Sequence, residues 1–299
     1  MPRRFATLDV FTRKRFAGNP LAVVLEADGL DGATMQTIAR EFNLAETVFV
    51  LPAEQAGHRA RLRIFTPAAE LPFAGHPTVG TAVLLNRIDG RTGRHEIVLE
   101  EGIGPVRCMA QAHGADAGHA RFELARLPSE LEGAPDRAAL AAALGIETTD
   151  IGFDAFLPGR WSAGVSFTFV PLRGLDAIRR CRVATAHWEA AFGPSGDAAA
   201  YMFCSETLDA ASAFHARMFA PRMGVAEDPA TGAAVAAFAG MLMRFAPPPD
   251  GEHEVLVEQG YEMGRPSIIR LAMTVHDRKL AAAAISGDAI VVSEGTIEA

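Results

Sequence analysis

Residues 61–82 read RLRIFTPAAELPFAGHPTVGTA, and residues 215–234 read HARMFAPRMGVAEDPATGAA. Both stretches contain an Arg-x-Phe-x-Pro pattern that predicts the end of a strand. Both then reach a polar residue, a proline and a glycine-containing segment, and the polar residue is His76 in the first stretch and Asp228 in the second. A repeat that carries different titratable groups at equivalent positions predicts two similar halves with complementary roles in one site.

The segments that follow the two prolines predict unusual helices. Pro77–Leu85 and Pro229–Met243 contain no charged residue, so each helix should be buried on every side. Proline at the first helical position would remove an amide that has no partner within the helix. Small residues that would let strands approach these helices closely are Gly80, Thr81, Gly232, Ala233, Ala234, Ala236 and Ala237. The pattern predicts an α+β fold of two pseudo-symmetric domains, each a mixed curved β-sheet or barrel wrapped around a central apolar helix.

Further parallels between the halves locate other elements. Asp9-Val10-Phe11 has a counterpart in Asp154-Ala155-Phe156, and in each half a glycine and then an apolar strand follow. We predict helices over 32–42, 137–144 and 184–191, strands over 47–51 and 201–204, and matching turns at 100–102 and 258–260. These assignments give an N-terminal domain over residues 1–128 and a C-terminal domain over residues 129–299. We expect the active site in the cleft between them.

Composition excludes several classes of protein. The 299 residues are 49% hydrophobic and 21% charged, which is typical of a soluble globular protein with enough chain for two cores. The net charge of −8 argues against nucleic acid or an anionic membrane as the main partner. Cys108, Cys181 and Cys204 fit no metal or disulfide pattern, and no apolar stretch is long enough to span a bilayer, so we expect a cytoplasmic protein.

The helix starts predict the chemistry. A helix that is buried all round leaves the amides of its first turn as its accessible polar end, and these amides favour anions such as carboxylate. Two such ends would hold a small anionic molecule between His76 and Asp228. Neither place carries a lysine, a set of metal ligands or a phosphate-binding loop. The sequence therefore predicts proton transfer without metal or cofactor.

Each candidate residue also has a simpler structural explanation. Asp228 before proline is an ordinary helix N-cap, and a lone histidine such as His76 is often a core residue. Glu46 could be a solvated surface charge, and Asn19 a turn residue. The repeat favours a functional role for His76 and Asp228, because a cap does not require histidine in one copy and aspartate in the other.

Several motifs, in order along nearly the whole chain, resemble the phenazine-biosynthesis isomerase (PhzF-like) family. They are Asp9-Val10-Phe11 with Gly18-Asn19-Pro20, Ala45-Glu46-Thr47, residues 70–78 reading ELPFAGHPT, and residues 227–232 reading EDPATG. The resemblance implies the diaminopimelate-epimerase-like fold, a homodimer, and no metal or cofactor. It also implies the activity of the family's prototype, which isomerises trans-2,3-dihydro-3-hydroxyanthranilate by moving a proton between two ring carbons.

The resemblance also implies roles for individual residues. Glu46 matches the family's proton-shuttling glutamate, and His76 and Asp228 match residues that hold and polarise the substrate. Substrate-binding positions carried over from the motifs are Asn19, Gly75, Pro77, Thr231, Gly232 and Ala233. Ala233 departs from the family, which has serine there, so a hydroxyl donor to a substrate carboxylate is lost.

Three hypotheses follow for function. The first is a cofactor-independent isomerase that acts on a small carboxylated substrate, with Glu46 as general base and then acid. The second is an epimerase or racemase of an amino or hydroxy acid that uses Glu46 and Asp228 on opposite faces; related epimerases use two cysteines, but here those positions hold Gly75 and Asp228. The third is a non-catalytic binding protein of the same fold. Substrate specificity is expected from loops such as 110–120 and 192–199.

Overall fold

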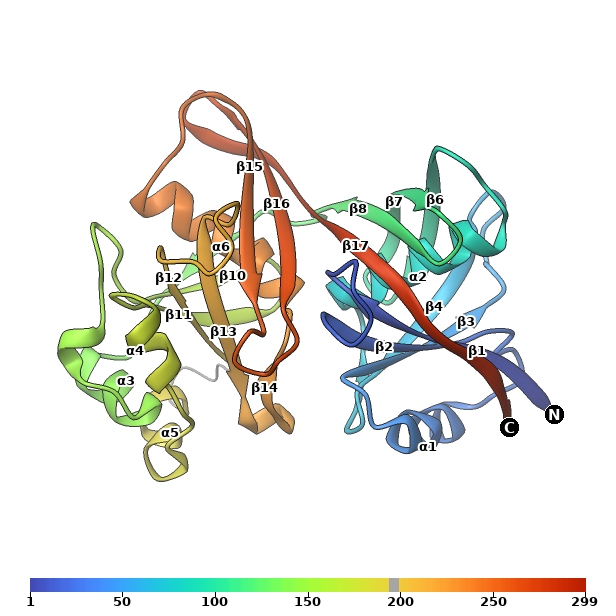
Figure 1. Cartoon of the computed structure of the whole chain (residues 1–299), viewed down its shortest axis with the longest axis horizontal. Helices are drawn as coiled ribbons and strands as arrows, with labels where there is room; N and C mark the ends of the chain where they lie inside the picture. Colours follow the sequence, from blue (N-terminus) through green and yellow to red (C-terminus); the bar gives the residue numbers. More distant parts are fainter. Residues whose placement is uncertain (194–198) are drawn as a thin grey trace. The chain divides into compact units, whose positions relative to one another are not determined.

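The chain forms two compact units in a computed structural model that describes residues 1–193 and 199–299 (Figure 1). The first unit is Met1–Glu123 with Ser286–Ala299, and the second is Leu124–Ile285. Residues from Ser286 onward, which sequence alone placed with the C-terminal half, therefore belong to the first unit. The reason is a long-range pairing that no local pattern reveals: β17 (Lys279–Glu298) runs antiparallel to the first strand of the chain.

The first unit is a closed mixed β-barrel with one helix inside and one outside. Its elements are β1 (Pro2–Val10), β2 (Asn19–Val24), α1 (Gly32–Phe42), β3 (Glu46–Leu51), β4 (Ala60–Phe65), β5 (Glu70–Leu71), α2 (Gly75–Ile88), β6 (Arg94–Glu101), β7 (Gly104–His113) and β8 (Ala117–Glu123). The strands pair in the order β17, β1, β2, β3, β4, β6, β7, β8, and β8 pairs with β17 to close the ring. The β2–β3 and β4–β6 pairs are parallel.

Helix α2 fills the interior of this barrel. Every residue from Gly75 to Asn86 is buried, and α2 contacts β1, β2, β3, β6, β7 and β8. Gly80 permits the close approach, because a Cβ atom there would lie 2.6 Å from Cδ2 of Leu21. The predicted central helix is thus confirmed, but Pro77 is its third residue rather than its first. Proline is tolerated there because the amides of the whole first turn lack partners within the helix.

The second unit repeats this plan with extra helices. Its elements are β9 (Ser129–Leu131), α3 (Arg137–Leu144), β10 (Gly159–Ser162), β11 (Ser166–Pro171), α4 (Leu175–Arg180), α5 (Thr185–Phe192), β12 (Ala200–Cys204), β13 (Phe214–Ala220), β14 (Val225–Asp228), α6 (Gly232–Phe245), β15 (Gly251–Gln259) and β16 (Ser267–His276), with 3-10 turns at Thr148–Asp150 and Pro221–Met223. The strands pair in the order β9, β10, β11, β12, β13, β15, β16. Helix α6 lies against β9, β10, β11 and β16. A Cβ at Gly240 of α6 would lie 2.1 Å from the ring of Trp161, so this helix also needs a glycine for close packing.

The predicted start of α6 at Pro229 is wrong, because the helix begins at Gly232. Asp228 ends β14, and the residues between strand and helix form a connection. Asp228 is therefore not the N-cap. Thr231 occupies that position, and its hydroxyl donates to Oδ2 of Asp228 at 2.6 Å instead of capping the helix. The local prediction failed because Asp-Pro also fits a strand end that is held by side-chain hydrogen bonds.

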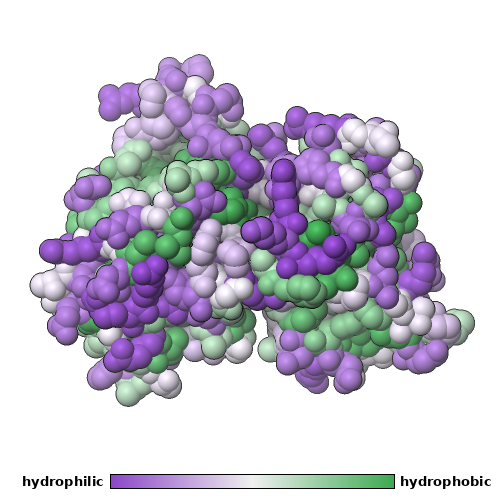
Figure 2. Space-filling view, viewed as in Figure 1, coloured by the Kyte–Doolittle hydropathy of each residue, from purple (hydrophilic) through white to green (hydrophobic). Residues whose placement is uncertain are grey.

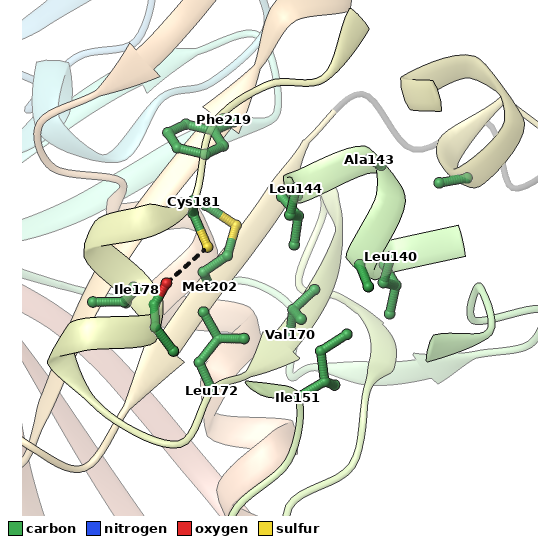
Figure 3. Packing of buried hydrophobic residues seen from close by; sticks show 14 of the residues in the cluster. Leu140, Ala143, Leu144, Ile151, Val170, Leu172, Ile178, Cys181, Met202 and Phe219 are labelled. Carbon is green, nitrogen blue, oxygen red and sulfur yellow. Dashed lines mark hydrogen bonds between the residues drawn. The ribbon is translucent and has the colours of Figure 1, made fainter. Parts of the chain in front are cut away.

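Helices α3, α4 and α5 build a second apolar layer in the second unit. Figure 3 shows Leu140 and Leu144 of α3 packed with Val170, Leu172 and other buried side chains. In the first unit α1 plays the equivalent part with buried Met35 and Ala39. These layers leave α2 and α6 as the interior helices of their units.

The two halves share a local device just before each interior helix. Arg63 donates two hydrogen bonds of 2.6 Å to Glu70 and lies over the phenylalanine ring two residues later. Arg217 makes the same contacts with Glu227, at 2.8 and 2.9 Å, and with the ring two residues later. The Arg-x-Phe-x-Pro motif is therefore a structural repeat that fixes the chain ahead of His76 and Asp228.

The surface agrees with the composition. Hydrophilic side chains cover much of the face in Figure 2, with smaller apolar areas among them. Over residues 1–193 and 199–299, no helix is both long and apolar enough to cross a membrane.

Candidate active site

Glu46 and His76 meet at the start of α2. Glu46 begins β3, and in the parallel ladder it lies opposite Leu21, one residue beyond Pro20. His76 is the second residue of α2. The His76 Nε2 atom lies 3.0 Å from Oε2 of Glu46, and the two side chains are only 6% and 17% exposed. The parallel β2–β3 pair thus holds a carboxyl group against a buried imidazole.

Burial favours the neutral form of the His76 imidazole. Burial lowers the pKa of His76 to about 3, and a hydrogen bond to the Pro20 backbone opposes this shift only in part. That bond raises the pKa because the ring donates to the Pro20 carbonyl. A neutral imidazole has a single N–H, so Nε2 faces Glu46 with a lone pair. The two atoms are close enough to share one proton, although their present orientation does not form a hydrogen bond.

The loop that leads into β2 is fixed by buried polar groups. The carboxylate of Asp9 accepts a hydrogen bond of 2.6 Å from the amide of Phe16. Gly18 has φ of +66°, and a Cβ atom there would lie 2.3 Å from the carbonyl oxygen of Val10, so only glycine fits. Asn19 follows as the first residue of β2 and is fully buried. The structure therefore places predicted residue Asn19 beside Pro20, the hydrogen-bond partner of His76.

The first turn of α2 presents backbone donors. Ala74 is the N-cap in an extended conformation and has no side chain that could accept a hydrogen bond. The amides of Gly75 and His76 lie among those that have no acceptor within a helix. Pro77 contributes no amide and keeps the turn helical. Gly75, His76 and Pro77 thus form a helix start suited to an anionic group.

In the second unit, Asp228 and Thr231 form a compact hydrogen-bonded group with Gln259. Thr231 Oγ1 donates to Asp228 Oδ2 at 2.6 Å. The amide nitrogen of Gln259 donates to the Asp228 carbonyl at 2.7 Å and to Thr231 Oγ1 at 3.0 Å, and its oxygen accepts from the Thr231 amide at 3.2 Å. Gly232 and Ala233 then begin α6. This network holds Asp228 as a fixed acceptor.

Gln259 is a residue that sequence reasoning missed as a site residue. It is fully buried at the end of β15, and Tyr201 also donates to its side-chain oxygen, at 3.3 Å. Burial, and then the charge of Asp228, raise the pKa of the Tyr201 hydroxyl, so Tyr201 stays a donor. The available signal was the repeated turn, because Gln259 is the counterpart of Glu101 in the first half.

Two sets of predicted residues are thus brought together, one in each unit. Asn19, Glu46, Gly75, His76 and Pro77 form the first set, and Asp228, Thr231, Gly232 and Ala233 form the second. Of the expected specificity loops, 110–120 proves to be mostly the β7–β8 hairpin, whereas 194–198 lies outside the described residues. In the part of the chain that the structure describes, no three or more His, Cys, Asp or Glu side chains are grouped to hold a metal ion.

Comparison with known proteins agrees with these motifs. The family model for phenazine biosynthesis-like protein matches residues 8–295. The chain belongs to this family. Its fold is the diaminopimelate-epimerase-like fold, and it is an isomerase of the family.

Individual relatives match over their whole length. An uncharacterized isomerase from Mesorhizobium japonicum is 49% identical, over 99% of this chain and 98% of the relative. The trans-2,3-dihydro-3-hydroxyanthranilate isomerase from Pseudomonas aeruginosa is 33% identical over 98% of each chain. The crystal structure of the Bacillus anthracis PhzF-family phenazine biosynthesis protein matches with a TM-score of 0.90 at 28% identity, over 100% of both chains.

Proposed function

We propose that this protein is a cofactor-independent isomerase that moves a proton on a small carboxylated substrate, with Glu46 as the group that removes and returns the proton. The observation that carries the proposal is the 3.0 Å contact between Glu46 Oε2 and Nε2 of neutral, buried His76. A general base must lie within hydrogen-bond distance of the proton it moves. The lone pair of His76 Nε2 lies within reach of the acid form of Glu46 and could accept its proton's hydrogen bond after a small reorientation. Neutral His76 would do so without adding charge.

The substrate class follows from the donors and acceptors of the two helix starts. The amides of Gly75 and His76 suit a carboxylate. Asp228 is held as an acceptor by Thr231 and Gln259, which suits an amino or hydroxyl group of the substrate. The relative from Pseudomonas aeruginosa is named for trans-2,3-dihydro-3-hydroxyanthranilate, which carries all three groups, so this compound is the first substrate to test.

Kinetics of matched variants test the proposal. Purified wild type is assayed on trans-2,3-dihydro-3-hydroxyanthranilate and on a panel of small amino and hydroxy acids. Glu46→Gln keeps the shape but cannot accept a proton, so turnover should fall about 100-fold or more while ligand binding persists. Glu54→Gln, an exposed glutamate of the same unit, should stay near wild type. Turnover in Glu46→Gln within a few-fold of wild type would refute the role of Glu46.

Product stereochemistry separates isomerisation from the second hypothesis. A single carboxyl group that takes and returns a proton on the same face cannot invert a stereocentre. Inversion of an amino or hydroxy acid, lost in both Glu46→Gln and Asp228→Asn, would instead support a two-base epimerase.

A further inference from the structure

A second carboxyl group, that of Glu101, lies beneath the start of α2. Glu101 is the last residue of β6 and only 7% exposed. Its Oε1 atom lies 2.8 Å from the hydroxyl of Thr78 in the first turn of α2. The same hydroxyl lies 2.8 Å from the carbonyl oxygen of Ala74, the N-cap. Nothing in the proposed reaction uses this group.

Hydrogen counting favours one position for the proton among these groups. Thr78 has one hydroxyl hydrogen, and two oxygen atoms compete for it. The Ala74 carbonyl can only accept, and it also receives the Thr78 amide at 3.2 Å. Both contacts of the Thr78 hydroxyl are satisfied at once only when it donates to Ala74 and accepts from Glu101. That arrangement requires a protonated Glu101. Its second oxygen, Oε2, is buried and makes no hydrogen bond with the described residues, which fits a neutral carboxylic acid better than a carboxylate.

The surroundings of Glu101 favour the same state. Burial raises the pKa of Glu101 to about 8, and the Thr78 contact offsets this only in part. Cys108 of β7 faces the group, and burial and then Glu101 raise the pKa of its thiol, so it adds no charge.

Glu101 also lines a cavity of about 610 Å³. The other charged groups that line this cavity make ion pairs or hydrogen bonds with one another or with the backbone. In that cavity Arg63 of β4 bonds Glu70 of β5, Arg61 of β4 bonds Glu54, and Glu100 accepts from the amides at 54 and 55. None of these groups supplies a positive charge to an ionised Glu101.

We propose that Glu101 is a positioning residue kept in its protonated form, whose donated hydrogen bond to Thr78 fixes the start of α2 and hence the orientation of His76. The proposal rests on the proposed function only in assigning this helix start to the substrate. Ionised Glu101 takes the Thr78 hydrogen from Ala74 and places a negative charge beneath the amides that would hold a substrate carboxylate. The site therefore loses affinity for carboxylates when Glu101 ionises.

The second half of the chain supplies the natural comparison. The turn Glu100-Glu101-Gly102 repeats as Glu258-Gln259-Gly260. Gln259 donates to the hydroxyl of Thr231 next to α6, at 3.0 Å. Glutamine is the isostere of a protonated glutamate, so under the proposal a neutral donor meets a threonine hydroxyl at the start of the interior helix in both halves.

The variant Glu101→Gln tests the proposal in two ways, with Glu96→Gln, an exposed glutamate of the same strand, as control. The first measurement is calorimetric unfolding between pH 5 and pH 9. An unfolded glutamate ionises near 4.5 and folded Glu101 near 8, so unfolding releases a proton between these values. As pH rises from about 5 to 8, the melting temperature of wild type should fall relative to that of Glu101→Gln. Above about pH 8 the difference between the two melting temperatures should stay constant.

The second measurement is the affinity for 2-aminobenzoate, a stable carboxylate probe, over the same pH range. Wild-type and Glu96→Gln affinity should fall about tenfold per pH unit above about pH 8, whereas Glu101→Gln should bind equally well throughout. Identical unfolding profiles in wild type and Glu101→Gln would show that Glu101 is ionised and overturn the proposal. If the melting temperature of Glu101→Gln lacks the pH dependence of wild type, but its affinity for 2-aminobenzoate still falls at alkaline pH as in wild type, the positioning role is overturned. Absence of binding at every pH would count against the proposed function, while the unfolding measurement would still decide the protonation of Glu101.

Discussion

Replacing Gln259 by alanine should strongly destabilise the second unit, because this one buried side chain takes part in four hydrogen bonds. The variant leaves the Thr231 amide, the Tyr201 hydroxyl and the Asp228 carbonyl without their partner. Each buried polar group left unsatisfied costs about 1–3 kcal/mol, so three such groups should lower the free energy of unfolding by about 3–9 kcal/mol. The range is wide because neighbouring groups can rearrange to share their remaining partners.

Urea unfolding followed by tryptophan fluorescence measures this loss in the correct unit. Trp161 and Trp188 are the two tryptophans of the chain, and both lie in the second unit. Gln111→Ala is the matched control, because Gln111 is exposed on β7 of the first unit; it should change stability by less than about 0.5 kcal/mol. A loss below about 1 kcal/mol in Gln259→Ala would refute the claim that this side chain holds Asp228 and Thr231 in place.

Three further outcomes are expected. His215 is buried between Glu258 and Glu262, and although burial opposes its charge, the two carboxylates raise its pKa above 6.5. The stability that charged His215 contributes is therefore complete below pH 6.5 and should be lost as pH rises through the raised pKa. In urea unfolding at a series of pH values, His215→Gln should lack this pH-dependent loss of stability. Gly240→Ala should destabilise the second unit by about 1–3 kcal/mol in the same assay, because its Cβ would overlap the Trp161 ring; an unchanged midpoint would contradict the packing of α6. Turnover should survive exhaustive dialysis against a chelator, and recovery only on adding a metal ion would contradict proton transfer by side chains alone.

The interior helices and the α+β class were predictable because their signals are local. A charge-free run such as residues 77–85 can only be buried, and the helices over 32–42 and 137–144 end where sequence placed them. The N-caps of these two helices are local signals as well, because Asp31 and Asp136 each accept a hydrogen bond from the amide of the third residue of the helix.

Other features depended on contacts that sequence does not display. The return of β17 to β1 joins residues from opposite ends of the chain. The start of α6 moved because Thr231 and Gln259 hold Asp228 at a strand end. Strand β10 (Gly159–Ser162) was not predicted, because it depends on pairing with both β9 and β11.

The candidate site shows the same division. Glu46 and His76 could be named from motifs, and the structure places them 3.0 Å apart. Their protonation could not be predicted, since it depends on burial of the ring and on the Pro20 carbonyl. Glu101 and Gln259 were visible only as a repeated turn, and their hydrogen bonds to Thr78 and Thr231 give that turn its meaning.

The fate of the transferred proton tests the central claim most directly. Substrate deuterated at the position that loses its proton is converted by wild type and by Glu46→Gln in ordinary water, and the product is examined by NMR. If Glu46 both removes and returns the proton, wild-type product should retain part of the deuterium at the new position, on the same face, and Glu46→Gln should neither convert the substrate nor exchange its label. Conversion or label exchange by Glu46→Gln at a rate near wild type, or delivery of the proton to the opposite face, would contradict a single shuttle at Glu46.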